Sequence, residues 1–169
     1  MQITSGQYFK SLSGLCYALI GGMVLFMVIA VVATLNGVQL EGGRANLSDV
    51  HAPNSVFYIV LAVFVLGGIT GSFNLFKKKL TAAKQKASLS EKLQDYRAAI
   101  IIRYALLEGP GLFSIIVYFI IGEMTVLTAT VVIILLMVYA RPDRDKLIND
   151  LELSSGEAAI INDPNSIVG

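Results

Sequence analysis

Four long apolar segments dominate this sequence and restrict what the chain can fold into. They cover about residues 12–35, 56–76, 98–121 and 124–140, and the last of them is the shortest. A helix of about 17 to 25 mostly apolar residues is long enough to cross the hydrocarbon core of a bilayer. Because lipid tails offer no hydrogen-bond partners, backbone at that depth must satisfy its own polar groups, as a helix does. The sequence therefore predicts an all-α membrane protein with four transmembrane helices.

The composition favours a membrane protein over a soluble domain. Hydrophobic residues make up 55% of the 169 residues, and charged residues only 15%. A soluble domain of this size buries too small a fraction of its chain to conceal so many apolar side chains. The first apolar segment is longer than the core of a cleaved signal peptide, and no small-x-small site follows it. We therefore expect it to remain as a span.

The Lys and Arg residues gather on one side of the predicted bundle. Seven fall between the second and third segments, three follow the fourth, and Lys10 precedes the first. With Arg103 at the start of the third segment they total twelve, against Arg44 alone in the loop between the first two. Positive residues concentrate on the cytoplasmic side of membrane proteins. We therefore expect both termini and the Lys-rich connection in the cytoplasm, with residues 39–55 and Glu123 on the opposite side.

The Lys-rich connection, residues 77–97, is expected to be a helical hairpin that extends the second and third spans. Residues 76–87 contain no Pro or Gly and are rich in good helix formers. Ser88 and Glu91 then match a capping box, which predicts that the next helix begins at about Leu89. Anionic lipid headgroups would be favoured beside the basic run at the start of this connection. That run consists of Lys77, Lys78 and Lys79.

The chain divides into a transmembrane part, 1–140, and an amphipathic tail, 141–169. Pro142 can either end the fourth span or open a new helix. An apolar stripe surrounded by acids follows, and Ser154 with Glu157 forms a second capping-box match. Such a helix can lie on the hairpin, on the bilayer or on a partner, and its acids favour the basic hairpin. The stripe consists of Leu147, Ile148 and Leu151.

Glu108 is the main candidate functional residue, because it lies inside the third apolar segment. An acid at that depth is costly and persists when it pairs, binds or conducts. Three roles are open to it. It can pair with Arg103, although five positions on an ideal helix put the two about 140° apart. It can stay protonated and bond a neighbouring helix, or it can bind a proton or cation.

Gly109, Pro110 and Gly111 follow Glu108 directly and weaken the helix at the same depth. Pro110 removes the donor for the carbonyl of Leu106, and the flanking glycines allow another backbone to approach. Two interpretations stay open. The first is a kink that shapes helix packing. The second is a discontinuous helix that binds an ion, as in some transporters.

Small residues mark the expected contacts between helices. Gly67, Gly68 and Gly71 lie on the second span, and Gly21 and Gly22 lie on the first. Small residues let helix backbones approach closely in a membrane. We expect these two faces to pack on each other within the chain, with an oligomer interface as the alternative.

Nothing in the sequence supports catalysis or a cofactor. The single cysteine, Cys16, lies in an apolar segment and is expected to be a packing residue. The single histidine, His51, lies in a polar loop and is expected to be a surface residue. No metal-ligand cluster, nucleophile with its base, or phosphate loop is present in the sequence. We therefore expect a protein that is not an enzyme, with no cofactor and no metal.

The stretch Arg103 to Phe113, Arg-Tyr-Ala-Leu-Leu-Glu-Gly-Pro-Gly-Leu-Phe, loosely resembles the carboxylate-bearing helix of the rotor-ring proteolipid subunits of ATPases. That resemblance covers the third span only, and it implies that Glu108 carries a proton or sodium ion. This chain differs from the rotor subunits in two ways. They place their termini on the side of the membrane opposite to that predicted here. Their other helix is dense in glycine, whereas the fourth apolar segment here contains none. The chain as a whole resembles a group of short four-span proteins of the bacterial inner membrane. Those proteins share the Lys-rich loop and the Arg-x-Ala-Leu-Leu-Glu-Gly-Pro stretch, and they imply a location in that membrane but no known activity.

These observations favour an accessory or scaffolding subunit of a larger membrane assembly. The expected partners are membrane lipids and either other membrane subunits or further copies of this chain. The net charge of +1 gives no reason to expect a nucleic acid. The alternative is a small proton or ion carrier that uses Glu108.

Overall fold

The structure is a computed structural model that describes residues 3–37 and 55–168. His51 and nearly all of the predicted 39–55 loop lie outside the described residues. Within them, three helices are long and apolar enough to cross a membrane. These are α1 (Ser5–Leu35), α3 (Ser55–Lys84) and α4 (Leu89–Ile121). The prediction of an all-α membrane protein agrees with this architecture.

The fourth apolar segment forms a short 3₁₀ turn, η1 (Met124–Val126), followed by α5 (Leu127–Tyr139). This pair would count as a fourth crossing only together with α6 (Arg144–Leu151), from which it is bent by 78°. The fourth span therefore stays a prediction. Pro142 lies between α5 and α6 and belongs to neither helix, so it ends the apolar segment and does not open α6.

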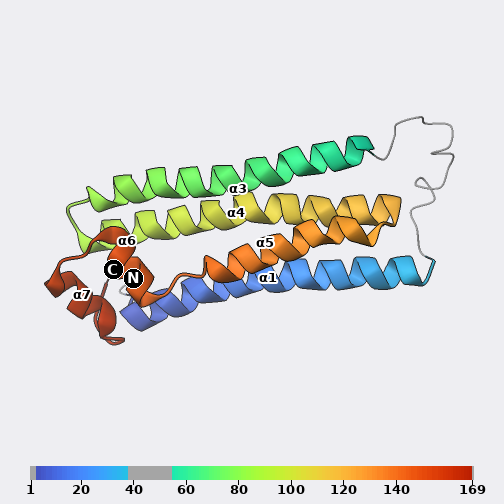
Figure 1. The fold of residues 1–169 in the computed structure, drawn as a ribbon. Coiled ribbons are helices and arrows are strands. Elements are labelled where there is room, and N and C mark those ends of the chain that lie inside the picture. The colour runs from blue at the N-terminus through green and yellow to red at the C-terminus, as the bar shows by residue number, and fades with distance from the viewer. Residues whose placement is uncertain (1–2, 38–54, 169) are drawn as a thin grey trace.

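Helix α4 is at the centre of the bundle (Figure 1). It packs against α3, α1 and α5, while α1 also contacts α5. In the most apolar window of α4, 44% of residues are buried, against 17% in the corresponding windows of α1 and α3. Both termini lie at the end of the bundle where α3 connects to α4 (Figure 1). This end is called the basic end below, because the Lys-rich hairpin forms it.

Local sequence signals set the boundaries of α4. The helix begins at Leu89, as predicted, and Ser88 is its N-cap, accepting a hydrogen bond from the backbone N–H of Glu91 at 3.2 Å. It ends at Gly122, which adopts φ 75°, a left-handed conformation that glycine reaches without strain. The hairpin connection therefore falls between Lys84 and Leu89, directly before the predicted start of the next helix.

The tail folds back onto the basic end through α6 and α7 (Ser155–Asn162). The capping box predicted at Ser154 and Glu157 is present with both of its hydrogen bonds. Leu147 and Leu151 of the predicted apolar stripe are buried, and Ile148 packs against the core. Burial of the apolar stripe removes these side chains from solvent and so favours docking of the tail onto the bundle.

Polar contacts hold the tail on the hairpin and on the N-terminus. Lys84 pairs with Glu152 at 2.7 Å, and Lys92 pairs with Glu157 at 2.8 Å. The Ser5 hydroxyl donates to the carbonyl of Ile161 at 2.6 Å. Three docking surfaces were predicted as possible for the tail. In the structure the tail docks on the basic hairpin of the same chain.

Candidate functional site

A close contact between α3 and α4 joins Gly68 to the turn that carries Pro110. A Cβ built on Gly68 would lie 2.4 Å from Cγ of Pro110 and 2.7 Å from the carbonyl oxygen of Leu106. Because Pro110 has no N–H, this carbonyl lacks its usual helical donor, and it faces the small Gly68. Helix α4 runs unbroken through Pro110. The structure therefore agrees with the packing interpretation of Pro110 and shows no discontinuous helix there.

Gly111 marks the place where α1 and α5 approach α4. A Cβ on Gly111 would lie 2.7 Å from Sδ of Met23 on α1 and 3.4 Å from Cγ2 of Ile133 on α5. Thr130 of α5 donates to the carbonyl of Gly111 at 3.1 Å. Gly109, in contrast, would meet only the ring of Phe64, at 3.9 Å. Gly111 therefore allows three helices to meet.

The expected packing of the glycine faces of α1 and α3 on each other is wrong. A Cβ on Gly21, Gly22, Gly67 or Gly71 would have nothing within 4 Å. Among the predicted contact glycines, only Gly68 lies against another helix, and that helix is α4. The reason is that α3 packs mainly on α4, while α1 packs on α4 and α5. The remaining glycines are left on open surfaces of the bundle.

Glu108 is half-buried, and no hydrogen bond or ion pair to it is formed within the described residues. On an ideal helix, position 108 lies about 20° around the axis from Ile115. Ile115 lines a crevice between α4 and α1, together with Phe26 and Ala30. Glu108 therefore lies on the side of α4 that faces α1.

The pairing of Glu108 with Arg103 is also wrong. The guanidinium of Arg103 stacks instead on two α3 rings, with its Cζ 4.9 Å from the centroid of Phe73 and 4.7 Å from that of Phe76. Because the two residues are five positions apart on the helix, their side chains point to different neighbours. Arg103 faces α3, and Glu108 faces α1. Pairing with Arg103 and a hydrogen bond to a neighbouring helix were two of the three roles predicted for Glu108. Within the described residues neither contact is formed.

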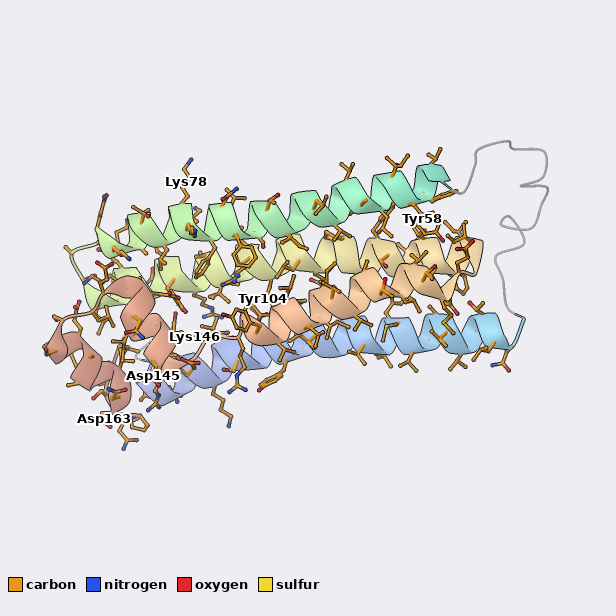
Figure 2. All side chains as sticks on the ribbon, viewed as in Figure 1. Tyr58, Lys78, Tyr104, Asp145, Lys146 and Asp163 are labelled. Atoms are coloured by element: carbon orange, nitrogen blue, oxygen red, sulfur yellow. The ribbon has the colours of Figure 1, made fainter. Side chains whose placement is uncertain are left out.

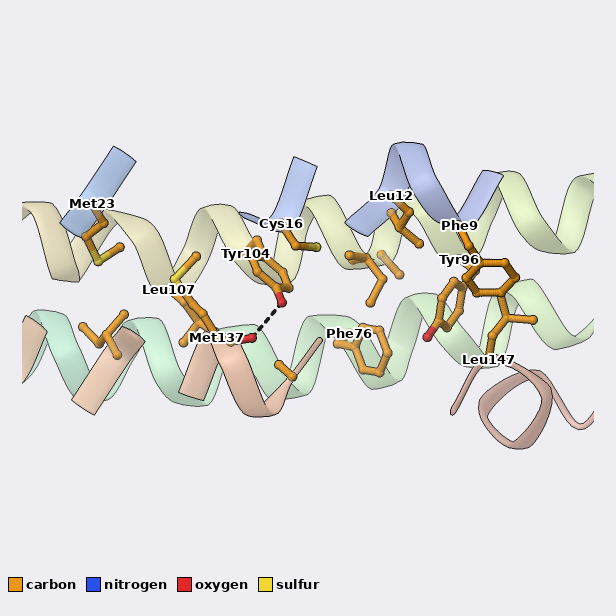
Figure 3. Packing of buried hydrophobic residues seen from close by; sticks show 14 of the residues in the cluster. Phe9, Leu12, Cys16, Met23, Phe76, Tyr96, Tyr104, Leu107, Met137 and Leu147 are labelled. Atoms are coloured by element: carbon orange, nitrogen blue, oxygen red, sulfur yellow. Dashed lines mark hydrogen bonds between the residues drawn. The ribbon is translucent and has the colours of Figure 1, made fainter. Parts of the chain in front are cut away.

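Two buried hydroxyl groups, which no sequence motif marks, join α4 to η1 and α5. The Tyr104 hydroxyl donates to the carbonyl of Met137 at 2.7 Å (Figure 3). The Ser114 hydroxyl donates to the carbonyl of Val126 at 2.6 Å. Both donors are fully buried. A buried hydroxyl without a hydrogen-bond partner is costly. Isolated polar residues in the third apolar segment could therefore have predicted these contacts between helices.

The hydrogen bond of Tyr104 completes the C-terminal end of α5. The last four carbonyls of a helix lack intrahelical donors. Leu136 and Val138 receive the backbone N–H groups of residues 140 and 141, Tyr139 receives Nζ of Lys146 at 3.0 Å, and Met137 receives Tyr104. All four carbonyls at the end of α5 are thus satisfied.

Charged and polar groups surround a cavity of about 200 Å³ at the basic end, and Arg103 lines it. Tyr96 and Arg103 come from α4, and Lys146 and Asp150 come from α6. The Tyr96 hydroxyl lies 3.4 Å from Oδ2 of Asp150. Burial raises the pKa of the Asp150 carboxyl, while Tyr96 and the nearby cations oppose that change.

The remaining predicted site residues lie apart from this cavity. Lys77, Lys78 and Lys79 are exposed on α3, and Lys78 projects away from the bundle (Figure 2). Cys16 is a buried free cysteine, in agreement with the predicted packing role. No cluster of three or more potential metal ligands occurs within residues 3–37 and 55–168.

Comparison with known proteins finds no match among family models, curated proteins or solved structures.

Proposed function

We propose that this protein is a non-enzymatic accessory or scaffolding subunit of a larger membrane assembly. In this proposal the chain crosses a bacterial inner membrane four times, with both termini and the basic end in the cytoplasm. The partners are other membrane subunits or further copies of the chain. The observation that carries the proposal is the carboxyl group of Glu108, which has no partner within the described residues.

An unsatisfied acid in a span favours association. Placing an acid at the centre of a span costs about 2.5 to 3.5 kcal/mol on insertion scales. A hydrogen bond to a side chain of another helix recovers roughly 0.6 to 2 kcal/mol of such a cost. Glu108 lies at the α1-facing edge of α4 and is half-buried, so a polar group of a neighbouring subunit can reach it.

The open glycines support the same conclusion. Gly21 and Gly22 on α1, with Gly67 and Gly71 on α3, have no neighbour within 4 Å of a built Cβ. Helices of another subunit can therefore approach these positions closely, and such approach is how membrane helices gain packing energy. Within this chain the four positions contribute no close contact.

Mild extraction followed by crosslinking and native mass spectrometry tests the proposal. We expect a homo-oligomer or a defined co-purifying membrane protein, and we expect Glu108→Leu to reduce its yield. Glu91→Gln is the matched control, because Glu91 is an exposed acid on the same helix outside the apolar segment. A monomer without any crosslinked partner would contradict the accessory role.

The same carboxyl group favours a second candidate, a small proton or ion carrier. A carboxyl without a fixed partner, on the side of α4 facing the α1 crevice, is able to exchange a proton or cation. Here Glu108→Gln should abolish ion flux in liposomes while leaving the thermal unfolding midpoint unchanged. Absence of flux with the unmodified protein would remove this candidate.

The proposed orientation is tested separately by cysteine labelling. In a Cys16→Ala background, Lys78→Cys should react with a membrane-impermeant maleimide only after the cytoplasmic face is exposed. Met124→Cys should react from the opposite face. Labelling of both positions from the same face would contradict the four-span arrangement.

A further inference from the structure

The polar cavity at the basic end lies where α3, α4 and α6 meet at the C-terminal end of α5. Its volume of about 200 Å³ equals that of roughly six or seven water molecules. Tyr139 lies on its rim and is 75% exposed, so the cavity reaches the surface of the bundle. A small polar ligand can therefore enter it.

Arg103 is the cation in this cavity that lacks an acceptor. Its Nε is fully buried and has no hydrogen-bond partner. Its remaining N–H groups make no hydrogen bond or ion pair with any residue in the described ranges. Phe73 and Phe76 lie against the face of the guanidinium, and ring stacking leaves the N–H groups on the edge unused. A cation in such a place is costly until an acceptor is supplied.

Asp150 lines the same cavity but does not supply that acceptor. No nitrogen of Arg103 lies within 4.0 Å of an Asp150 oxygen, the limit for an ion pair. Asp150 instead faces the Tyr96 hydroxyl and feels the charges of Lys84 and Lys146 as well as that of Arg103. The space between Arg103 and Asp150 is therefore lined by charge on both sides and is not closed by a direct contact.

Lys146 adds a second positive charge to the cavity. Its Nζ donates to the carbonyls of Tyr139 and Arg141, both at 3.0 Å, and lies 3.9 Å from Oδ2 of Asp143. These bonds hold the ammonium in place at the cavity wall. The charged side chains that line the cavity are Arg103, Lys146 and Asp150, with a net charge of +1, and Asp143 lies outside this lining as the ion-pair partner of Lys146.

We infer that this cavity binds a phosphate group, with Arg103 as its main ligand and Lys146 as the second cation. The planar fork of an arginine matches two oxygens of a phosphate. Arg103 lies five residues from Ala98, the predicted start of the span, which corresponds to about 7.5 Å of helix. A long basic side chain at that depth reaches toward the headgroup level. The phosphate comes from a phospholipid headgroup or from solution.

Binding to the purified full chain, stripped of lipid in mild detergent, tests this assignment. The probes are short-chain phosphatidylglycerol, an uncharged glycolipid of the same chain length, and inorganic phosphate. We expect a phosphate-bearing probe to bind, and the glycolipid to bind at least about tenfold more weakly. Arg103→Gln should weaken phosphate binding about tenfold or more, the size expected for the loss of a charge-assisted pair.

Two further variants keep the test decisive. Lys10→Gln removes an exposed positive charge at the same end and should change affinity less than about twofold. Arg103→Lys keeps the charge but loses the fork, so it should fold and still bind more weakly than the unmodified chain. Phosphatidylglycerol binding without inorganic phosphate binding identifies a lipid site, whereas competition by inorganic phosphate identifies a site for the free ion. Equal losses in Arg103→Gln and Lys10→Gln, or no preference over the glycolipid, would overturn the assignment.

Discussion

Replacement of Gly68 by alanine should separate α3 from α4 where Gly68 lies against the Pro110 turn. The new Cβ would lie 2.4 Å from Cγ of Pro110 and 2.7 Å from the carbonyl oxygen of Leu106, where ordinary contacts begin at 3.4 Å. The carbonyl belongs to the backbone of α4, so it cannot yield by rotating a side chain. The two helices must therefore move apart by several tenths of an ångström.

Gly71→Ala is the matched control for this change. It lies on the same helix, and its Cβ would have nothing within 4 Å. Both substitutions gain the same helix propensity, about 0.5 to 1 kcal/mol, so this term cancels when the two variants are compared. What remains is the cost of overpacking, typically about 1 to 3 kcal/mol. Gly68→Ala should be less stable than Gly71→Ala by that amount.

Reversible unfolding in detergent micelles with increasing dodecyl sulfate measures this difference. Gly111→Ala should fall between the two variants, because its closest neighbour is the flexible Met23 side chain. Equal unfolding free energies for Gly68→Ala and Gly71→Ala would refute the close contact between α3 and α4.

Three other predictions concern the end of α5 and the tail. Tyr104→Phe removes the donor to the carbonyl of Met137 and should lower the unfolding free energy in detergent by about 0.6 to 1.7 kcal/mol. Leu147→Ala removes a side chain with no exposed surface and should weaken tail docking by about 2 to 5 kcal/mol, seen as faster proteolysis after residue 140. The hydrogen bond from Lys92 holds the pKa of the Glu157 carboxyl below its usual range, so its stabilising contribution is present at neutral pH. That contribution should disappear as the pH falls below about 4, seen as faster hydrogen exchange in α7.

Each of these three predictions has a control within the chain. Tyr139→Phe changes an exposed hydroxyl and should leave stability unchanged. Ile160→Ala shortens a partly exposed tail residue and should accelerate proteolysis far less than Leu147→Ala. Lys92→Met should reduce the acid dependence of exchange in α7, while the hydrogen bonds from Ser154 to Glu157 remain. The tail contacts would be contradicted by an Ile160 effect as large as that of Leu147, or by an unchanged pH profile in Lys92→Met.

Local signals made several features of the fold predictable. The start of α4 at Leu89 and the capping box at Ser154 depend on residues within a few positions of each other. Such contacts form wherever the rest of the chain lies, because they satisfy the first N–H groups of a helix. The buried face of the tail was predictable too. Leu147 and Leu151 stand out against acids, since water outside the bundle makes a helix amphipathic.

The sequence alone determined that long helices form here and that the tail favours the basic hairpin. The tertiary structure decided which faces of the apolar helices meet. In the apolar segments every side of a helix is hydrophobic, because lipid and protein are equally apolar neighbours, so no stripe marks the inner face. For this reason Gly68 could not be told from Gly67 before the structure placed α4 against it. For the same reason the sequence did not show which helix each charged side chain faces. In the structure Arg103 faces the rings of α3 and the polar cavity, and Glu108 lies on the side of α1 without a partner among the described residues.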